Sequence, residues 1–348
     1  MRSGTYKETF SDLVVLTDSG LVKFWAALLV VALVALPFAV NAYILSLLTL
    51  VLITATGALG LNILTGMTGL ISLGHAGFLV LGAYAYAVPV AKYGWPPLAG
   101  FAMAALAPAL ASIVVGLPSL RLRGLYLAIT TLAFSYIITS LILDADTLTN
   151  GARGIAVMRP TLFGIDFDSD QRFALLCLAI AALALFASLN IARSRVGRAF
   201  NAIRDNDIAA RTMGISLQRY KLYAFMTSAI FTGIAGALMG IYLSFVSVEG
   251  FPFLLSIEAL AILIVGGLGS SLGAVLGTIF IVLLPEAVSA LFRLVGGPFE
   301  SLLSTGVHEV KSIVYGLIII LFLRFEPRGL VGLWRDAKRL WVNWPLRY

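Results

Sequence analysis

Side chains able to do chemistry are scarce in this sequence, and their spacing does not assemble a reaction centre. The chain has two histidines, His75 and His308, and one cysteine, Cys177. Neither histidine combines with the cysteine or with closely spaced carboxylates into a metal site or an activated nucleophile. A lone cysteine also excludes an intramolecular disulfide. We therefore predict no catalytic residue, no metal and no cofactor held by the chain itself, which is expected not to be an enzyme.

A nucleotide-binding loop is missing as well. The sequence contains no Gly-x-x-x-x-Gly-Lys-Ser/Thr segment, and none of its lysines follows a glycine. The chain cannot hydrolyse ATP through such a loop. If it moves a solute uphill, the energy must come either from a coupled ion or from an ATPase that binds to the chain.

Four polar residues within or beside apolar runs are candidates for lining a solute path. Glu258 lies about two turns from the outer end of its run, where a carboxylate is costly unless it faces a cavity or a partner. Ser72 and His75 lie where a short turn passes into the next predicted helix. The Ser72 hydroxyl could instead cap that helix, and the His75 imidazole could bond a carbonyl. The tentative substrate-path residues are Asn62, Ser72, His75 and Glu258.

The elements that hold these residues are predicted to be membrane helices. The 348 residues are 60% hydrophobic and 12% charged, with a mean hydropathy of +1.00, whereas a soluble domain is about 25% charged. The apolar runs approach or exceed the roughly 20 residues that a helix needs to cross hydrocarbon, and they lack the alternation of a membrane barrel. We predict an all-α polytopic bundle.

Glycine, proline and charged residues divide the sequence into about ten predicted spans. These are 24–40, 43–64, 75–91, 98–117, 124–143, 173–192, 222–247, 252–267, 272–292 and 310–324. Two glycine-rich stretches, 60–78 and 266–278, each contain Ser-Leu-Gly, which hints at an internal repeat. They predict broken helices, or tight helix hairpins with close backbone packing.

The segment 193–221 sets the predicted topology. It reads RSRVGRAFNAIRDNDIAARTMGISLQRYK and is strongly basic. A basic loop between membrane helices lies in the cytoplasm, which puts the aspartate-rich loop 144–172 outside and both termini inside. The predicted division is a cytoplasmic N-terminal segment 1–23, a transmembrane domain 24–324 and a cytoplasmic basic tail 325–348. The same rule explains the net charge of +7 without a nucleic-acid partner.

Residues 208–214, Ile-Ala-Ala-Arg-Thr-Met-Gly, resemble the Glu-Ala-Ala-x-x-x-Gly signature of permease subunits in ABC importers, with Ile208 in place of the glutamate. In that family the signature is a short cytoplasmic helix that docks in a groove of the ATP-binding subunit. Docking needs small residues on the buried side and a glycine that ends the helix. An ordinary amphipathic surface helix is the alternative. The residues assigned to ATPase coupling are Arg204, Asp207, Ala209, Ala210 and Gly214.

Further blocks in the same order resemble the branched-chain amino acid ABC permease family, and within it the subunit with the longer outer loop. They are SLGHAGFLVLGAY, LTNGARGI, LLSIEALAILIVGGLGS and FEPRGLVG, and the resemblance covers roughly residues 45–335. It implies a multi-pass subunit of a bacterial or archaeal cytoplasmic (inner) membrane. The implied partners are a homologous second permease, two subunits that bind ATP, and a periplasmic or extracellular substrate-binding protein.

Two rival functions remain open at this stage. Urea and short-chain amide permeases share the Ser-Leu-Gly-His block, so the cargo could be smaller and more polar than leucine. An ion-coupled transporter working alone would more often show buried charges in several spans, whereas only Glu258 and Glu286 qualify here.

Overall fold

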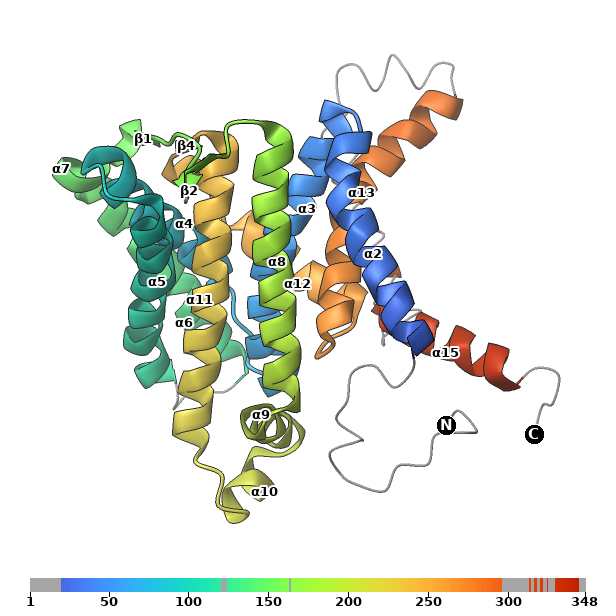
Figure 1. Cartoon of the computed structure of the whole chain (residues 1–348). Helices are drawn as coiled ribbons and strands as arrows, with labels where there is room; N and C mark the ends of the chain where they lie inside the picture. The colour runs from blue at the N-terminus through green and yellow to red at the C-terminus, as the bar shows by residue number, and fades with distance from the viewer. Residues whose placement is uncertain are drawn as a thin grey trace.

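The protein is a bundle of helices in the computed structural model, which describes residues 20–119, 124–162, 164–295 and 329–343, with a few positions between 313 and 324 (Figure 1). The helices are α2 Gly20–Ala39, α3 Ala42–Leu61, α4 His75–Ala87, α5 Pro97–Ser119, α6 Leu125–Asp144, α7 Asp146–Thr149, α8 Asp170–Arg193, α9 Arg195–Asp205, α10 Asp207–Thr212, α11 Leu217–Leu243, α12 Leu254–Gly266, α13 Ser271–Val295 and α15 Gly329–Asn343. Two π-helical turns, η1 Asn62–Met67 and η2 Val88–Lys92, extend α3 and α4, and two 3-10 turns are η3 Gly151–Arg153 and η4 Val248–Gly250. The short strands are β1 Ile155–Ala156, β2 Thr161–Leu162, β3 Ile165–Asp166 and β4 Phe245–Val246.

Several of the predicted membrane spans correspond to helices that are long and apolar enough to cross a membrane. Within the described residues, six helices are long and apolar enough to cross a membrane: Ala42–Met67, Pro97–Leu117, Leu125–Asp144, Asp170–Arg193, Leu217–Leu243 and Val248–Gly266. Each matches one predicted span. The other described helices in predicted spans are α2, α4 and α13; α2 begins at Gly20 rather than at residue 24. Most of the predicted span 310–324, and residues 1–19, lie outside the described residues.

Helix α11 packs closely against α3, α4 and α5, and glycines make that packing possible. A Cβ added to Gly82 of α4 would lie 2.3 Å from the Gly233 carbonyl oxygen of α11, and one on Gly236 would lie 2.0 Å from the Leu79 carbonyl oxygen of α4. Lipid and protein interior are equally apolar, so close backbone approach is a principal source of helix association in a membrane. These glycines therefore allow the close central packing of α4 and α11, around which the other helices are placed.

The Gly82→Ala substitution is expected to lower the free energy of unfolding by about 1–3 kcal/mol, the usual cost of forcing an extra carbon into a packed interior. The midpoint of thermal unfolding in detergent measures it. Gly250→Ala is the matched control, because the nearest atom to its added Cβ is at 3.7 Å, an ordinary contact. Equal stability of the two variants would contradict the close crossing of α4 and α11.

Both glycine-rich stretches interrupt helices. The first break comprises the π-helical turn η1 and the segment after it, up to the start of α4 at His75, and the second break is the turn 267–270 of the tight hairpin formed by α12 and α13. Irregular backbone is tolerated in a membrane protein only where its polar groups are satisfied. The Leu73 N–H donates to Thr131 Oγ1 at 2.9 Å, the Ala76 N–H to Ser256 Oγ at 2.9 Å and the Gly77 N–H to Ser135 Oγ at 3.2 Å. Hydroxyls from α6 and α12 thus replace the missing helical bonds.

Ser72 does not cap α4, which corrects one interpretation of the sequence. The residue at the N-cap position is Gly74, and α4 has no side-chain cap. The Ser72 hydroxyl accepts a hydrogen bond from the Gly74 N–H at 3.2 Å. Its role in the break is therefore to hold the turn that precedes the helix.

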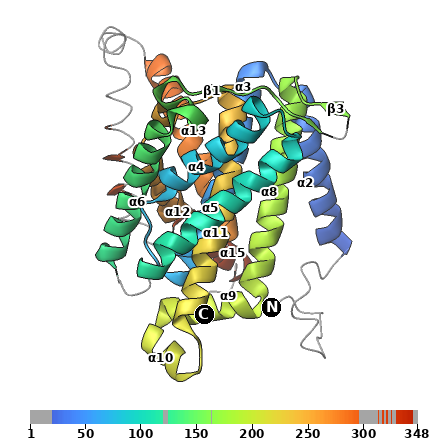
Figure 2. The same cartoon turned by 90° about the vertical axis from the view of Figure 1, so that its left-hand side faces the viewer.

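The two loops that set the predicted topology lie at opposite ends of the bundle. Figures 1 and 2 show α9 and α10 at the lower end, and α7, β1 and β4 at the upper end, with α8 running between them. Strand β1 pairs antiparallel with β4, and β2 with β3. The Arg159 guanidinium pairs with Asp170 and lies 5.5 Å from the centroid of the Phe173 ring, which fastens this loop to the start of α8.

Part of the predicted basic tail is helical. Helix α15 packs against α12 and α13, and a Cβ added to Gly329 would lie 2.6 Å from the Gly267 N atom in the turn between them. Gly329 has a φ of +67°, which glycine adopts readily. The tail is therefore attached to the second helix break, a contact that charge composition did not predict.

Candidate functional site

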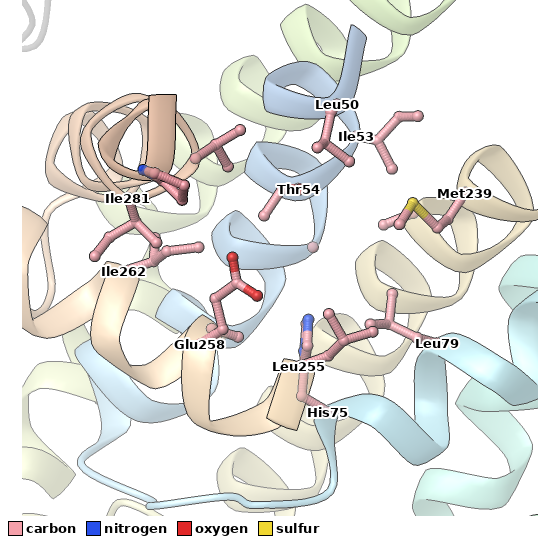
Figure 3. A pocket seen from close by; sticks show the side chains of 15 residues that line it. Leu50, Ile53, Thr54, His75, Leu79, Met239, Leu255, Glu258, Ile262 and Ile281 are labelled. Atoms are coloured by element: carbon pink, nitrogen blue, oxygen red, sulfur yellow. The ribbon is translucent and has the colours of Figure 1, made fainter. Parts of the chain in front are cut away.

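A cavity of about 250 Å³ opens between α3, α4, α11, α12 and α13. Figure 3 shows its wall, in which Leu50 and Ile53 of α3, Leu79 of α4 and Met239 of α11 lie across from Ile262 and Ile281. Among the described residues the lining is apolar except for Thr54, His75 and Glu258. An aliphatic enclosure with a few convergent polar groups is the usual composition of a small-molecule site.

Glu258 occupies the second turn of α12, and its carboxylate points into the cavity between Thr54 and His75 (Figure 3). Within the described ranges no hydrogen bond or ion pair reaches this carboxylate, and the side chain is half-buried. A carboxylate in an apolar helix is costly unless it meets water, a cation or a polar ligand. In the structure this carboxylate faces a cavity.

His75 is buried at the first position of α4. Its Nδ1 lies 3.4 Å from Thr232 Oγ1 of α11, and a Cβ on Gly57 of α3 would lie 3.2 Å from its Nε2. The next residue, Ala76, is bonded to Ser256 of α12. Because Ser256 precedes Glu258 by two residues, this bond fixes α12 relative to α4 and holds the two polar side chains on one cavity.

Asn62 and Ser72 do not line this cavity. Asn62 is fully buried in η1, and its Oδ1 accepts a hydrogen bond from the Gly269 N–H at 3.0 Å. Its Nδ2 has no hydrogen-bond partner among the described residues. Of the four tentative path residues, the structure thus brings His75 and Glu258 together and places Asn62 and Ser72 in the first helix break.

The two helix breaks meet at Asn62, Gly66, Arg204 and Gly269, which we call the glycine junction. Arg204 Nη1 donates to the Gly66 carbonyl oxygen at 2.6 Å. A Cβ on Gly269 would lie 2.5 Å from that same Nη1, and one on Gly66 would lie 2.1 Å from Asn62 Oδ1. Only glycine allows this approach. One arginine of α9 therefore contacts both breaks, although they are about 200 residues apart in the sequence.

Helix α10 is short, and hydrogen bonds cap both of its ends. Asn206 Oδ1 accepts from the Ile208 and Ala209 N–H groups at 3.0 and 3.1 Å, which caps the start. At the end, the Gly214 N–H donates to the Arg211 carbonyl and the Ile215 N–H to the Ala210 carbonyl, each at 3.0 Å. This is a Schellman motif, and the φ of +83° at Gly214 explains why glycine stands there.

The two alanines of the predicted signature differ in exposure. Ala210 is 4% exposed because it packs within its own chain, whereas Ala209 is exposed. Ile208, which replaces the usual glutamate, is 65% exposed, and Met213 is 85% exposed. Two apolar side chains of α10 and its C-cap therefore point outward, beside the exposed Arg211 and Thr212, and Met213 was not among the predicted residues. Asp207 lies in the first turn of α10, and Arg204 points back to the glycine junction.

The family model described as the permease component of a branched-chain amino acid transport system matches residues 43–323. The chain belongs to this family. The family is a membrane permease component and not a catalytic subunit, which agrees with the absence of a nucleotide-binding loop from the permease's sequence. The resemblance of the sequence to this permease family is thereby confirmed.

The permease has relatives in bacteria and archaea. It is 35% identical over 341 residues to the high-affinity branched-chain amino acid transport system permease protein LivM of Escherichia coli strain K12, covering 91% of the permease and 76% of the relative. The probable LivM of Methanocaldococcus jannaschii is 26% identical, covering 68% of the permease and 70% of the relative. The E. coli K12 permease protein LivH is 26% identical, covering 79% and 90%. No solved structure matches the permease.

Proposed function

We propose that the permease forms, together with a homologous second permease, the membrane path of an ABC importer for branched-chain amino acids. Two ATP-binding subunits would drive it, and a periplasmic or extracellular binding protein would deliver the cargo. The proposal rests first on the 35% identity to a permease named for this transport. Similarity to LivH as well as to LivM supports a pair of related permeases.

The observation that carries the coupling role is the outward surface of α10. A helix capped at both ends presents exposed Ile208 and Met213 beyond the end of the bundle, which is what a helix that docks in a groove requires. On this proposal the end with α9 and α10 faces the cytoplasm, as its basic residues favour. The loop 144–172 then faces outside, and both termini face inside.

The contacts of α9 suggest how motion at α10 would reach the path. ATP binding closes the two ATPase subunits and displaces α10, which is joined to α9 through the capping residue Asn206. Arg204, near the end of α9, donates a hydrogen bond to the Gly66 carbonyl of the first break and contacts Gly269 of the second. Displacement of α9 would therefore move both breaks, and the adjoining helices would rock between outward and inward openings.

The cavity favours an aliphatic cargo over urea. Its lining is apolar except for three polar side chains, so a urea molecule would leave most of its hydrogen-bonding groups unpaired, whereas a branched alkyl chain would be accommodated. The same apolar enclosure disfavours short-chain amides.

The test is purification of the tagged permease from its native membrane in mild detergent, followed by mass spectrometry and uptake measurements. We expect a second permease and ATPases with nucleotide-binding loops to co-purify, and the reconstituted complex to take up labelled leucine in preference to labelled urea. Transport by the permease alone, or preference for urea by the complex, would contradict the proposal.

A further inference from the structure

We propose that the cavity between α3, α4, α11, α12 and α13 is a transit site within this one subunit, where the Glu258 carboxylate accepts the ammonium group of an aliphatic amino acid. The inference rests on the proposed function. It adds where in the permease the cargo is recognised and which of its groups is recognised.

The charge of the cavity is the first reason to expect an ammonium group there. Among the described residues Glu258 is its one carboxylate, and neither a cation nor a hydrogen-bond donor neutralises it. A ligand that brings a cationic group to this carboxylate removes the cost of burying it, while a ligand without a cationic group does not. The cavity therefore selects for an ammonium group.

The shape of the cavity carries the second step. The polar side chains Thr54, His75 and Glu258 lie near one another, and the rest of the wall is built from aliphatic side chains of several helices (Figure 3). A ligand with a polar head and a branched alkyl tail matches this division, since its tail leaves water as its head meets the carboxylate. Among the described residues no lysine or arginine lines the cavity to hold the carboxylate of the cargo, so the amino group is the recognised end.

The position of Glu258 on α12 carries the third step. Helix α12 ends at Gly266, directly before the turn whose Gly269 belongs to the glycine junction. At its other end it is tied to the start of α4 through Ser256 and Ala76. A displacement of the junction by α9 would therefore act on the helix that holds the ammonium acceptor, so that binding and release at the cavity follow the movement of α10.

The test uses cysteine chemistry on the complete importer in nanodiscs. The only cysteine of the permease, Cys177, is buried in α8, so in a Cys177→Ala background Thr54→Cys supplies the only thiol of this subunit, and labelling is quantified on its separated band. We expect the Thr54→Cys thiol to react faster with a cationic than with an anionic methanethiosulfonate, and L-leucine to slow the reaction. Adding Glu258→Gln should reduce both the charge preference and the leucine protection by roughly tenfold, the effect of about 1.4 kcal/mol.

Matched variants and ligands sharpen the outcome. Glu249→Gln removes an exposed carboxylate near the start of α12 and should leave both effects unchanged. Met239→Cys repeats the measurement from α11, so that one poorly folded variant does not decide it. Among protecting ligands, 3-methylbutylamine should protect and 4-methylpentanoate should not, because only the amine carries the recognised group.

The outcomes separate this inference from the proposed function. If the Thr54→Cys complex takes up leucine but protection is absent, persists in Glu258→Gln, or is given equally by 4-methylpentanoate, the transit site is wrong and the importer stands. If the assembled parent complex takes up no leucine with its binding protein present, the proposed function itself is wrong.

Discussion

Replacing Arg204 with alanine is expected to lower coupled uptake by at least about tenfold while leaving the importer assembled. The Arg204 guanidinium donates to the Gly66 carbonyl of the first helix break and lies against Gly269 of the second. A hydrogen bond to a charged group contributes about 1.5–3 kcal/mol. Its loss would shift the equilibrium between the state in which Arg204 connects the two helix breaks and the state in which they are separate by roughly 10- to 100-fold. Leucine uptake should fall by at least about tenfold, with ATP hydrolysis continuing without transport.

The control is Arg198→Ala on the same helix. Arg198 is exposed, and the bond that its guanidinium makes is a local one, to the Arg193 carbonyl at 3.2 Å. Uptake and ATPase activity are measured in the same proteoliposomes for both variants. Arg204→Lys tests geometry as well as charge, because an ammonium lacks the planar fork of donors and should restore uptake only in part. Equal uptake by Arg204→Ala and Arg198→Ala would show that the glycine junction does not transmit the motion of α9.

Asn62 illustrates what the sequence could not give. It was predicted tentatively as a path residue, and in the structure its Oδ1 accepts a hydrogen bond from the Gly269 N–H at 3.0 Å. That partner lies about 200 residues away, and no local pattern encodes such a pairing. The glycine-rich character of both stretches predicted two breaks, but only the tertiary structure shows that they meet at Arg204.

Gly214 and Glu258 show the opposite case, where local chemistry decides. A glycine just after a short amphipathic segment predicted a helix end, and the Schellman motif at Gly214 agrees because its φ of +83° disfavours other residues. A carboxylate within an apolar run predicted a cavity, since few other surroundings tolerate it. The surroundings of such residues can be predicted from the sequence, because only a few conformations or environments accommodate them without a large cost in free energy.

The predicted span 75–91 agrees with α4 and its π-helical extension η2, which together run from His75 to Lys92. Hydropathy does not explain, however, why α4 begins where it does. Its start lies inside the protein, where Ser135 and Ser256 accept bonds from its first amides. Hydropathy records the apolar run but not the hydroxyls of other helices that allow a helix to begin at that depth.

The Gly214→Glu substitution is expected to disconnect the ATPase from transport. A residue other than glycine in the left-handed region costs roughly 1–2 kcal/mol, which would open the Schellman motif and release the end of α10. The side chain itself has room, since no atom of the described residues lies within 4 Å of an added Cβ, so the bundle should remain folded. Loss of α10 geometry should reduce co-purification of the ATPase subunits and leucine uptake, each by about tenfold or more.

Gly94→Glu separates backbone strain from loss of the docking surface. Gly94 also has a positive φ, +67°, and no atom within 4 Å of an added Cβ, but it lies in the loop between η2 and α5, away from α10. The two variants therefore carry the same kind of strain and the same new charge. If only Gly214→Glu loses the ATPase subunits, the closed geometry of α10 is what they bind. If both variants retain the ATPase subunits, exposed Ile208 and Met213 do not form the docking surface, and the ATPase must bind another part of the permease.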